Sequence, residues 1–279
     1  MEAEMSDQQI YNFFKYTTEP PKMLGQLHIT ALLITSLLVV FFCIRFSKSS
    51  EAVVRSFIFI CWLILLIFET YRQISYSIRM GDEGIYWDYD WGQLPLQVCS
   101  VQLYALPFIV FLKDGRLRNS FICIMMTWSL IGGLGVTIYP GNTFIDLFGI
   151  TIQSIVHHAI QVILGIFLAV RYGPRLGYRD FFGGFLVFTI YFFIAMWANV
   201  MGPELLSDKH VDDAINMFFL SPYHQPLIEV LNRIRNATSH SVMVIIYMGL
   251  FHIGAAIVFQ IELILTSGRK RITKREIAA

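Results

Sequence analysis

The chain has 279 residues, of which 56% are hydrophobic and only 15% are charged, and its formal net charge is +1. Soluble domains carry about 25% charged residues, so this composition excludes an ordinary soluble protein. The near-neutral charge gives no argument for nucleic acid or another highly charged partner. Basic residues stand in short clusters between long apolar runs. We therefore predict an all-α polytopic membrane protein.

Seven apolar segments are long enough to cross a bilayer, which needs about 20 mostly apolar residues. They are preceded by a polar segment, residues 1–26, that lacks the early apolar run of a cleavable signal peptide. We expect a seven-helix domain over residues 27–265 and a basic cytoplasmic tail over 266–279. In chain order, the predicted transmembrane helices cover residues 27–46, 53–78, 92–112, 119–139, 148–170, 181–201 and 241–265.

The distribution of Lys and Arg predicts the orientation of these helices. Basic residues flank the first, third and fifth connections and fill the C-terminal tail, whereas the intervening connections are acidic or neutral. Since short cytoplasmic loops are enriched in Lys and Arg, we predict an N-terminus outside and a C-terminus in the cytoplasm. The membrane would be the plasma membrane in a bacterium, and the endoplasmic reticulum or another endomembrane in a eukaryote.

Polar side chains within the predicted helices are candidate functional residues, because a charge at the bilayer centre costs about 2.5–3.5 kcal/mol. At 1.5 Å per residue, Cys99 lies about 10 Å below the outer end of its helix, and His157 and His158 lie about 13–15 Å below theirs. We therefore expect a polar cluster in the outer half of the bundle. Its candidate members are Cys99, His158, His157, Glu69, Arg72, Gln102, Gln161 and His252.

A cysteine beside a histidine has a chemical rationale, because the thiolate is the nucleophile and the imidazole accepts the thiol proton. Helical phasing places His158 on one face with Thr151, Ser154 and Gln161, which favours His158 over His157 as the residue facing the polar interior. Gln102 and Gln161 are candidate oxyanion donors.

Structural explanations also fit these polar residues. Glu69 and Arg72 also suit a structural ion pair, and Cys99 also suits a small apolar packing residue. No metal is expected, since adjacent histidines point about 100° apart and lack the i, i+4 spacing of helical metal sites.

The segment Leu-Pro-Leu-Gln-Val-Cys-Ser at 94–100 resembles the Leu-Pro-Leu-x-x-Cys-Ser signature of the YwaF-type integral membrane proteins. His28, residues 156–159 (Val-His-His-Ala) and the run 216–222 resemble further segments of that family. The family includes a eukaryotic branch of transmembrane acyltransferases that act on ether phospholipids. The resemblance implies, without any cofactor, that Cys99 accepts a fatty acyl group from a phospholipid as a thioester. The group would then pass to a lysophospholipid, with His158 as the acid-base residue.

Two functional hypotheses follow. The first is a lipid acyltransferase, or a related lipid ester hydrolase, that uses Cys99 and one of the two adjacent histidines. The second is a transporter or receptor-like bundle in which Glu69, Arg72 and His252 bind a polar solute or an ion. The oligomeric state is not predicted.

Overall fold

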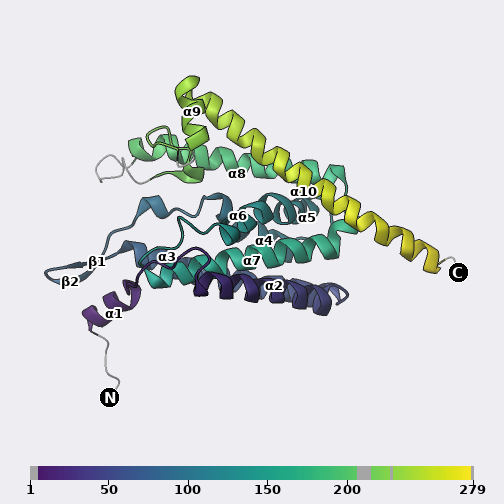
Figure 1. Ribbon diagram of the computed structural model, residues 1–279, viewed down its shortest axis with the longest axis horizontal. Coiled ribbons are helices and arrows are strands. Elements are labelled where there is room, and N and C mark those ends of the chain that lie inside the picture. The colour runs from purple at the N-terminus through teal and green to yellow at the C-terminus, as the bar shows by residue number, and fades with distance from the viewer. Residues whose placement is uncertain (1–5, 206–214, 227–228, 278–279) are drawn as a thin grey trace, which may run out of the picture.

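The long helices of the protein lie side by side, and a small β-hairpin projects from one end of the bundle (Figure 1). The computed structural model describes residues 6–205, 215–226 and 229–277. The helices are α1 (Asp7–Phe14), α2 (Gln26–Phe46), α3 (Glu51–Ser77), α4 (Val101–Phe111), α5 (Arg116–Ile124), α6 (Leu130–Ile138), α7 (Phe148–Tyr172), α8 (Tyr178–Leu205), α9 (Glu229–Ala237) and α10 (His240–Ile277). Strands β1 (Ile78–Gly81) and β2 (Gly84–Trp87) pair antiparallel.

Six helical segments within the described ranges are long and apolar enough to cross a membrane. They are Gln26–Phe46, Glu51–Ser77, Arg116–Ile138, Phe148–Arg175, Tyr178–Gly202 and His240–Leu265. These segments match six of the seven predicted spans, so the protein is an integral multi-pass membrane protein. The third predicted span, 92–112, is different, because its apolar helix covers only Val98–Phe111.

Pro95 explains why this helix starts late. A residue before proline is pushed out of the helical region, and Leu94 has a ψ of 132°. The chain therefore runs without α-helix from Asp88 to Gln97, apart from one 3₁₀ turn, and then forms a second 3₁₀ turn, Val98–Ser100, that leads into α4. Cys99 thus lies in the first turn of a short helix, and the depth counted along a continuous helix from Gly92 does not apply.

Two residues of α3 hold α4 in place. Pro107 lies inside α4 and has no N–H, so the carbonyl of Leu103, four residues earlier, loses its helical donor. Trp62 of α3 donates to that carbonyl from its indole Nε1 at 2.9 Å. At the other end of α4, Arg55 Nη1 donates to the carbonyls of Val110 and Leu112, at 2.6 and 2.7 Å.

Helix α7 lies at the centre of the bundle. In α7, 72% of the most apolar stretch is buried, against 11% in α2 and 17% in α10. Large apolar side chains on the outside of α2 remain exposed, such as Leu37 at 69% and Ile44 at 77%. These flanks are suited to lipid, which cannot satisfy polar groups.

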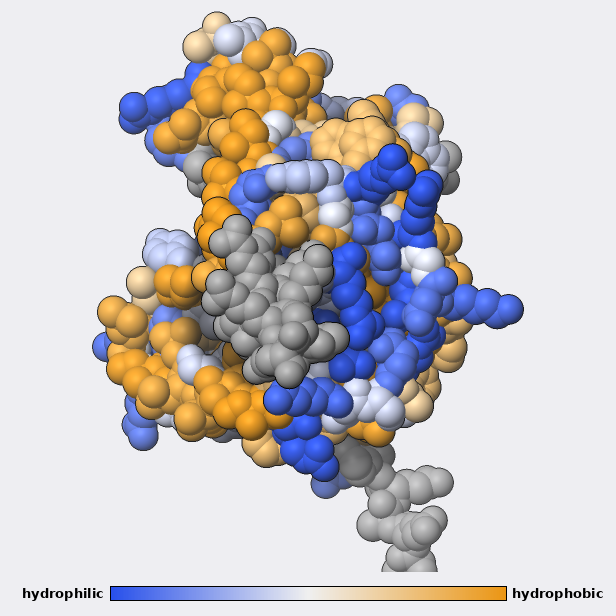
Figure 2. All heavy atoms as spheres, turned by 90° about the vertical axis from the view of Figure 1, so that its right-hand side faces the viewer, coloured by the Kyte–Doolittle hydropathy of each residue, from blue (hydrophilic) through white to orange (hydrophobic). Residues whose placement is uncertain are grey.

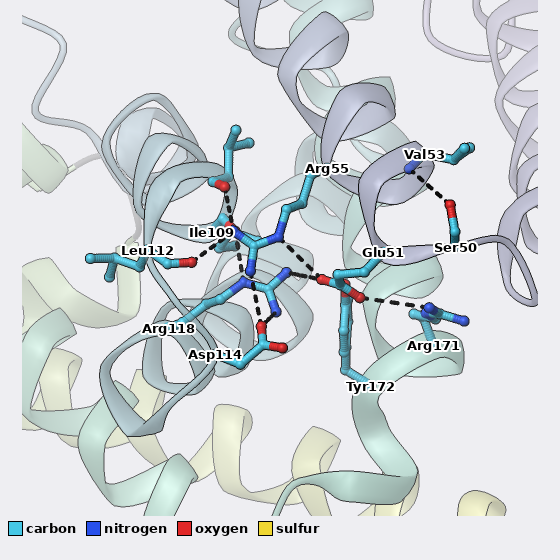
Figure 3. A network of polar contacts seen from close by, with 11 residues as sticks. Ser50, Glu51, Val53, Arg55, Ile109, Leu112, Asp114, Arg118, Arg171 and Tyr172 are labelled. Atoms are coloured by element: carbon cyan, nitrogen blue, oxygen red, sulfur yellow. Dashed lines mark hydrogen bonds and ion pairs between the residues drawn. The ribbon is translucent and has the colours of Figure 1, made fainter.

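We call the end that contains the start of α3 and the end of α7 the basic end, and the opposite end the hairpin end. Figure 2 looks onto the basic end and shows hydrophilic side chains gathered there, with hydrophobic residues around them. Here Glu51 Oε1 accepts from the buried Arg118 at 2.6 Å and from the Tyr172 hydroxyl at 2.7 Å (Figure 3). Asp114 accepts from both Arg118 and Arg55, at 2.8 and 2.9 Å. This network joins α3, the α4–α5 connection and α7.

A π-helical turn, Met125–Ser129, lies between α5 and α6, within one of the six spanning segments. Such wide turns recur at functional sites, because they shift the side chains that follow out of the regular helical phase. Gly132 and Gly133 come next in α6 and face α7. The predicted fourth span thus contains a π-helical turn followed by two glycines, and the first of these glycines lies close to Cys99.

Candidate functional site

The structure brings together Cys99, Gln102 and His157. His157, on α7, has its ring Nε2 3.1 Å from the carbonyl oxygen of Cys99. Gln102, in the first turn of α4, donates from Nε2 to the carbonyl oxygen of His157 at 3.0 Å. Two hydrogen bonds therefore join the start of α4 to His157 of α7, one from the His157 side chain and one to the His157 backbone carbonyl.

Gln161 lies one turn further along α7 and belongs to the same group. Its amide Nε2 donates to Ser129 Oγ at 3.0 Å. A Cβ atom built on Gly132 would lie 3.7 Å from Gln161 Nε2 and 3.9 Å from Cys99 Sγ, and one on Gly133 would lie 2.9 Å from Gln161 Cγ. The two glycines thus leave room in which the thiol and the Gln161 amide approach the same point.

The hydrogen bond of His157 identifies which ring nitrogen is available. A carbonyl oxygen only accepts, so the neutral ring carries its hydrogen on Nε2 and donates it to Cys99 O. His157 Nδ1 then holds a lone pair, and it is buried without a hydrogen-bond partner among the described residues. Gln102 Oε1 and Gln161 Oε1 are also buried without a partner in this part of the chain. Three unpaired polar atoms within the group formed by Cys99, Gln102, His157 and Gln161 are unusual, since buried polar groups are nearly always satisfied.

His158 faces away from this group. Its Nδ1 lies 2.7 Å from the carbonyl oxygen of Ser154, so it donates there and leaves Nε2 with the lone pair. The His158 ring lines a small cavity between α2, α6 and α7, together with His28, Thr137 and Ser154. The cavity volume of about 20 Å³ has room for one water molecule. The geometry therefore pairs Cys99 with His157, whereas phasing favoured His158.

The polar face of α7 that suggested His158 has another cause. Thr151 Oγ1 accepts from the backbone N–H of Ile145 at 3.1 Å, which fixes the α6–α7 connection. His28 lies on α2 beside the same face, accepts at Nδ1 from Leu24 N at 3.0 Å and bonds through Nε2 to Thr137 O at 2.9 Å. The part of this face formed by Thr151, Ser154 and His158 therefore meets α2 and the connecting loop, whereas Gln161, further along α7, lies on the side of Cys99.

Glu69 and Arg72 form an ion pair that supports the segment before Cys99. Arg72 Nη1 lies 2.7 Å from Glu69 Oε1, and Arg72 Nη2 donates to Gln93 Oε1 at 2.8 Å. Gln73 donates both to Glu69 and to the carbonyl of Gln93, each at 2.6 Å. Glu69, Arg72 and Gln73 of α3 thus anchor the 3₁₀ turn Trp91–Gln93.

His252 lies in a different place. Its Nδ1 accepts from Trp128 Nε1 at 3.1 Å, so its Nε2 carries the hydrogen and donates to Thr189 Oγ1 at 3.3 Å. The ring packs on Phe185 with centroids 4.2 Å apart. His252 therefore joins α8 and α10 to the π turn, and the structure does not bring it together with Glu69 and Arg72. Within the described ranges, no group of three or more His, Cys, Asp or Glu side chains is arranged to hold a metal ion.

Gln97 connects the Cys99 turn to a distant loop. Its Nε2 donates to the carbonyl of Asn216 at 3.0 Å, and its Oε1 accepts from the N–H of Phe218 at 2.7 Å. Tyr191 of α8 donates its hydroxyl to Gln97 O at 2.9 Å, and Asn199 exchanges two hydrogen bonds with the backbone of Met217. The segments 94–100 and 216–222, which both carried the family resemblance, thus lie against each other. Hydropathy gave no signal for Tyr191 and Asn199.

The fold and the site define a multi-pass α-helical membrane protein with a cysteine and a histidine in contact between its helices. A family model matches residues 23–266, which is most of the chain, so the protein belongs to the TMEM164 family. This match confirms the family resemblance indicated by the motif around Cys99. No curated protein and no solved structure matched the chain.

Proposed function

We propose that the protein is a membrane-embedded lipid acyltransferase that carries a fatty acyl group on Cys99 as a thioester. The donor is a phospholipid and the acceptor a lysophospholipid. One observation carries the proposal: His157 is fixed against Cys99 through Nε2, while its Nδ1 is buried and has no partner among the described residues. An imidazole bonded to the backbone of a cysteine, with an unpaired second ring nitrogen, supports nucleophilic cysteine chemistry, in which a base takes the thiol proton.

The first half of the reaction forms the thioester. His157 accepts the thiol proton, and the sulfur of Cys99 attacks the ester carbonyl carbon of the phospholipid. The carbon–oxygen bond of the ester breaks, and the proton passes from His157 to the leaving oxygen of the lysophospholipid. The enzyme then holds an acyl group on Cys99 in place of the thiol proton, which has left on the hydroxyl group of the lysophospholipid.

The second half reverses these steps with a different acceptor. The hydroxyl group of the incoming lysophospholipid gives its proton to His157 and attacks the thioester carbonyl. The carbon–sulfur bond breaks, and the proton returns to the Cys99 sulfur. With water as the acceptor, the same steps release a free fatty acid, so product analysis distinguishes transferase from hydrolase.

The surroundings of Cys99 favour negative charge at two stages. The first N–H groups of a helix have no partner inside it and carry the positive end of the helix dipole, and Cys99 lies at the start of α4. This stabilises the thiolate and the oxyanion of the tetrahedral intermediate. Gln161 Nε2 is a further donor close to Gly132, where the absent Cβ leaves space beside the sulfur. We assign it the role of an oxyanion donor.

Intact mass spectrometry of the purified protein, after incubation with phospholipid vesicles, tests the thioester. We expect an acyl adduct that hydroxylamine removes, present in wild type and in Cys43→Ala and absent in Cys99→Ala. The partly buried Cys43 of α2 serves as the matched control. Undiminished acyl transfer to lysophospholipid by Cys99→Ala would refute the proposal.

The two histidines are separated by the same assay. His157→Ala should slow acyl transfer by about 10²–10⁴-fold, the usual contribution of a general base. His158→Ala should affect transfer far less, because its ring faces the cavity beside α2. The reverse ranking, with both variants folded, would assign the base to His158 instead.

A further inference from the structure

A second cavity lies at the hairpin end, between α1 and the adjoining ends of α3 and α7. Its volume of about 650 Å³ lies within the range of roughly 300–1,000 Å³ that is typical of small-molecule sites. The walls are apolar and largely aromatic. They are formed by Phe13 and Tyr16 at α1, Phe68 and Tyr71 of α3, and Phe148 and Ile152 of α7.

Helix α1 is fixed at both ends in a way that keeps this groove open. At its start, Asp7 Oδ2 accepts from the N–H of Ile85 in β2 at 3.1 Å. Just beyond its end, the carbonyl of Tyr16 accepts from the N–H of Phe148 at 3.1 Å, and Thr18 N donates to Asp146 O at 2.8 Å. The helix is therefore tied to the hairpin at its start and to the α6–α7 connection just beyond its end.

The floor of the groove depends on a glycine. A Cβ atom built on Gly149 would lie 1.8 Å from the hydroxyl oxygen of Tyr71. Only glycine lets the Tyr71 ring lie across α7, where Phe14 also packs on it with ring centroids 5.4 Å apart. Tyr71 thus closes the bottom of the groove between α3 and α7.

The lining of the groove indicates the kind of ligand. Phe13 and Tyr16 are each 60% exposed although they face an apolar groove. The polar side chains in the lining, Gln9 and Asn12, both come from α1. Since α3 and α7 cross the membrane, the groove opens where the acyl chains of the bilayer begin. It therefore offers apolar walls on the bundle side and amide groups on the α1 side.

We infer that this groove binds one acyl chain of a membrane phospholipid, with the ester region of the lipid next to Gln9 and Asn12. The site is separate from Cys99, because His157 and Gln161 lie on a different face of α7. The inference does not depend on the proposed acyl transfer. The bound acyl chain would pack between α1 on one side and α3 and α7 on the other, and would thereby stabilise α1 against the bundle.

Native mass spectrometry of protein purified in mild detergent tests the site with added phosphatidylcholine. We expect wild type to retain one phospholipid per chain. Ile152→Trp fills the groove and should lower the affinity for phospholipid about tenfold, which corresponds to roughly 1.4 kcal/mol of binding free energy. Ile190→Trp is the matched control, since Ile190 is 60% exposed on α8. It should retain lipid as wild type does.

Photo-crosslinking provides a second measurement that needs no variant. A phosphatidylcholine with a diazirine on its acyl chain, in vesicles, should label peptides containing Phe13 or Ile152, and unlabelled lipid should compete. Equal retention by folded Ile152→Trp and wild type, or labelling without competition, would overturn the inference. If wild type is instead a dimer without bound lipid, and Ile152→Trp dissociates that dimer, the groove binds a second copy of the chain. This result would also overturn the inference.

Discussion

Trp62 supplies the hydrogen bond that Pro107 removes from α4, and this compensation is directly testable. The carbonyl of Leu103 has Trp62 Nε1 at 2.9 Å in place of a helical N–H. Leu103 is buried, so Trp62→Phe leaves its carbonyl oxygen without a donor in an apolar environment. An unsatisfied buried acceptor costs about 1–3 kcal/mol, in addition to the packing lost with the smaller ring.

Pro107→Ala provides the background that isolates the hydrogen bond. With alanine at position 107, the restored N–H donates to Leu103 O, so the loss of Trp62 no longer strands that oxygen. Trp62→Phe then removes packing only. We expect a coupling energy of about 1–2 kcal/mol from the double-mutant cycle, above the roughly 0.6 kcal/mol of an average hydrogen bond between membrane helices.

The measurement is the free energy of unfolding from titration with a denaturing detergent, followed by circular dichroism. Trp197→Phe on α8, where the ring is 60% exposed, controls for the loss of an indole at the lipid-facing surface. It should show no coupling to Pro107→Ala. If Trp62→Phe and Pro107→Ala add within about 0.3–0.5 kcal/mol, the compensation is refuted.

Three further contacts can be tested, two by the same titration with a matched control and one by proteolysis. Arg118→Met removes a guanidinium that is 3% exposed and paired with Glu51, and should cost about 3–5 kcal/mol. Arg233→Met breaks an exposed pair and should cost less than about 1 kcal/mol, so equal losses would contradict the role of the network. Gly165→Ala puts a Cβ 3.0 Å from Leu130 and should cost about 1–3 kcal/mol, whereas Gly249→Ala meets nothing within 4 Å and should not destabilise. Gln97→Leu should speed proteolysis at residues 216–221, and an unchanged cleavage rate would argue against that contact.

Apolar length alone predicted six of the spanning helices, because each contains about 20 residues that only a bilayer or a core accommodates. The same criterion was misleading for 92–112. Hydropathy measures side chains, and the shape of this segment is set by the backbone restriction at Leu94 and by Pro95. Its hydrogen-bonding partners lie in α3, α8 and the loop at 216–218, which no local pattern identifies.

The nearness of Cys99 to the histidines of α7 was predicted from their depths, and His157 does bond the carbonyl of Cys99, although the depth counted along a continuous helix from Gly92 does not hold for Cys99. The choice of the base between His157 and His158 stays a prediction: phasing favours His158, and the contact with the carbonyl of Cys99 favours His157. The polar residues around His158 serve α2 and the α6–α7 connection, and a helical wheel cannot tell which neighbour a polar face meets. Trp62, Tyr191 and Asn199 were missed for the same reason, since each acts on a backbone atom far away in the sequence.

The pairing of Gln97 with the main chain at residues 216 and 218 constrains how this protein can vary in evolution. Both partners are backbone atoms, so these two hydrogen bonds do not depend on which side chains stand at those positions. They do depend on register, because inserting or deleting one residue between positions 216 and 218 would withdraw at least one partner. The turn that holds Cys99 should therefore tolerate substitutions in this loop more readily than changes in its length.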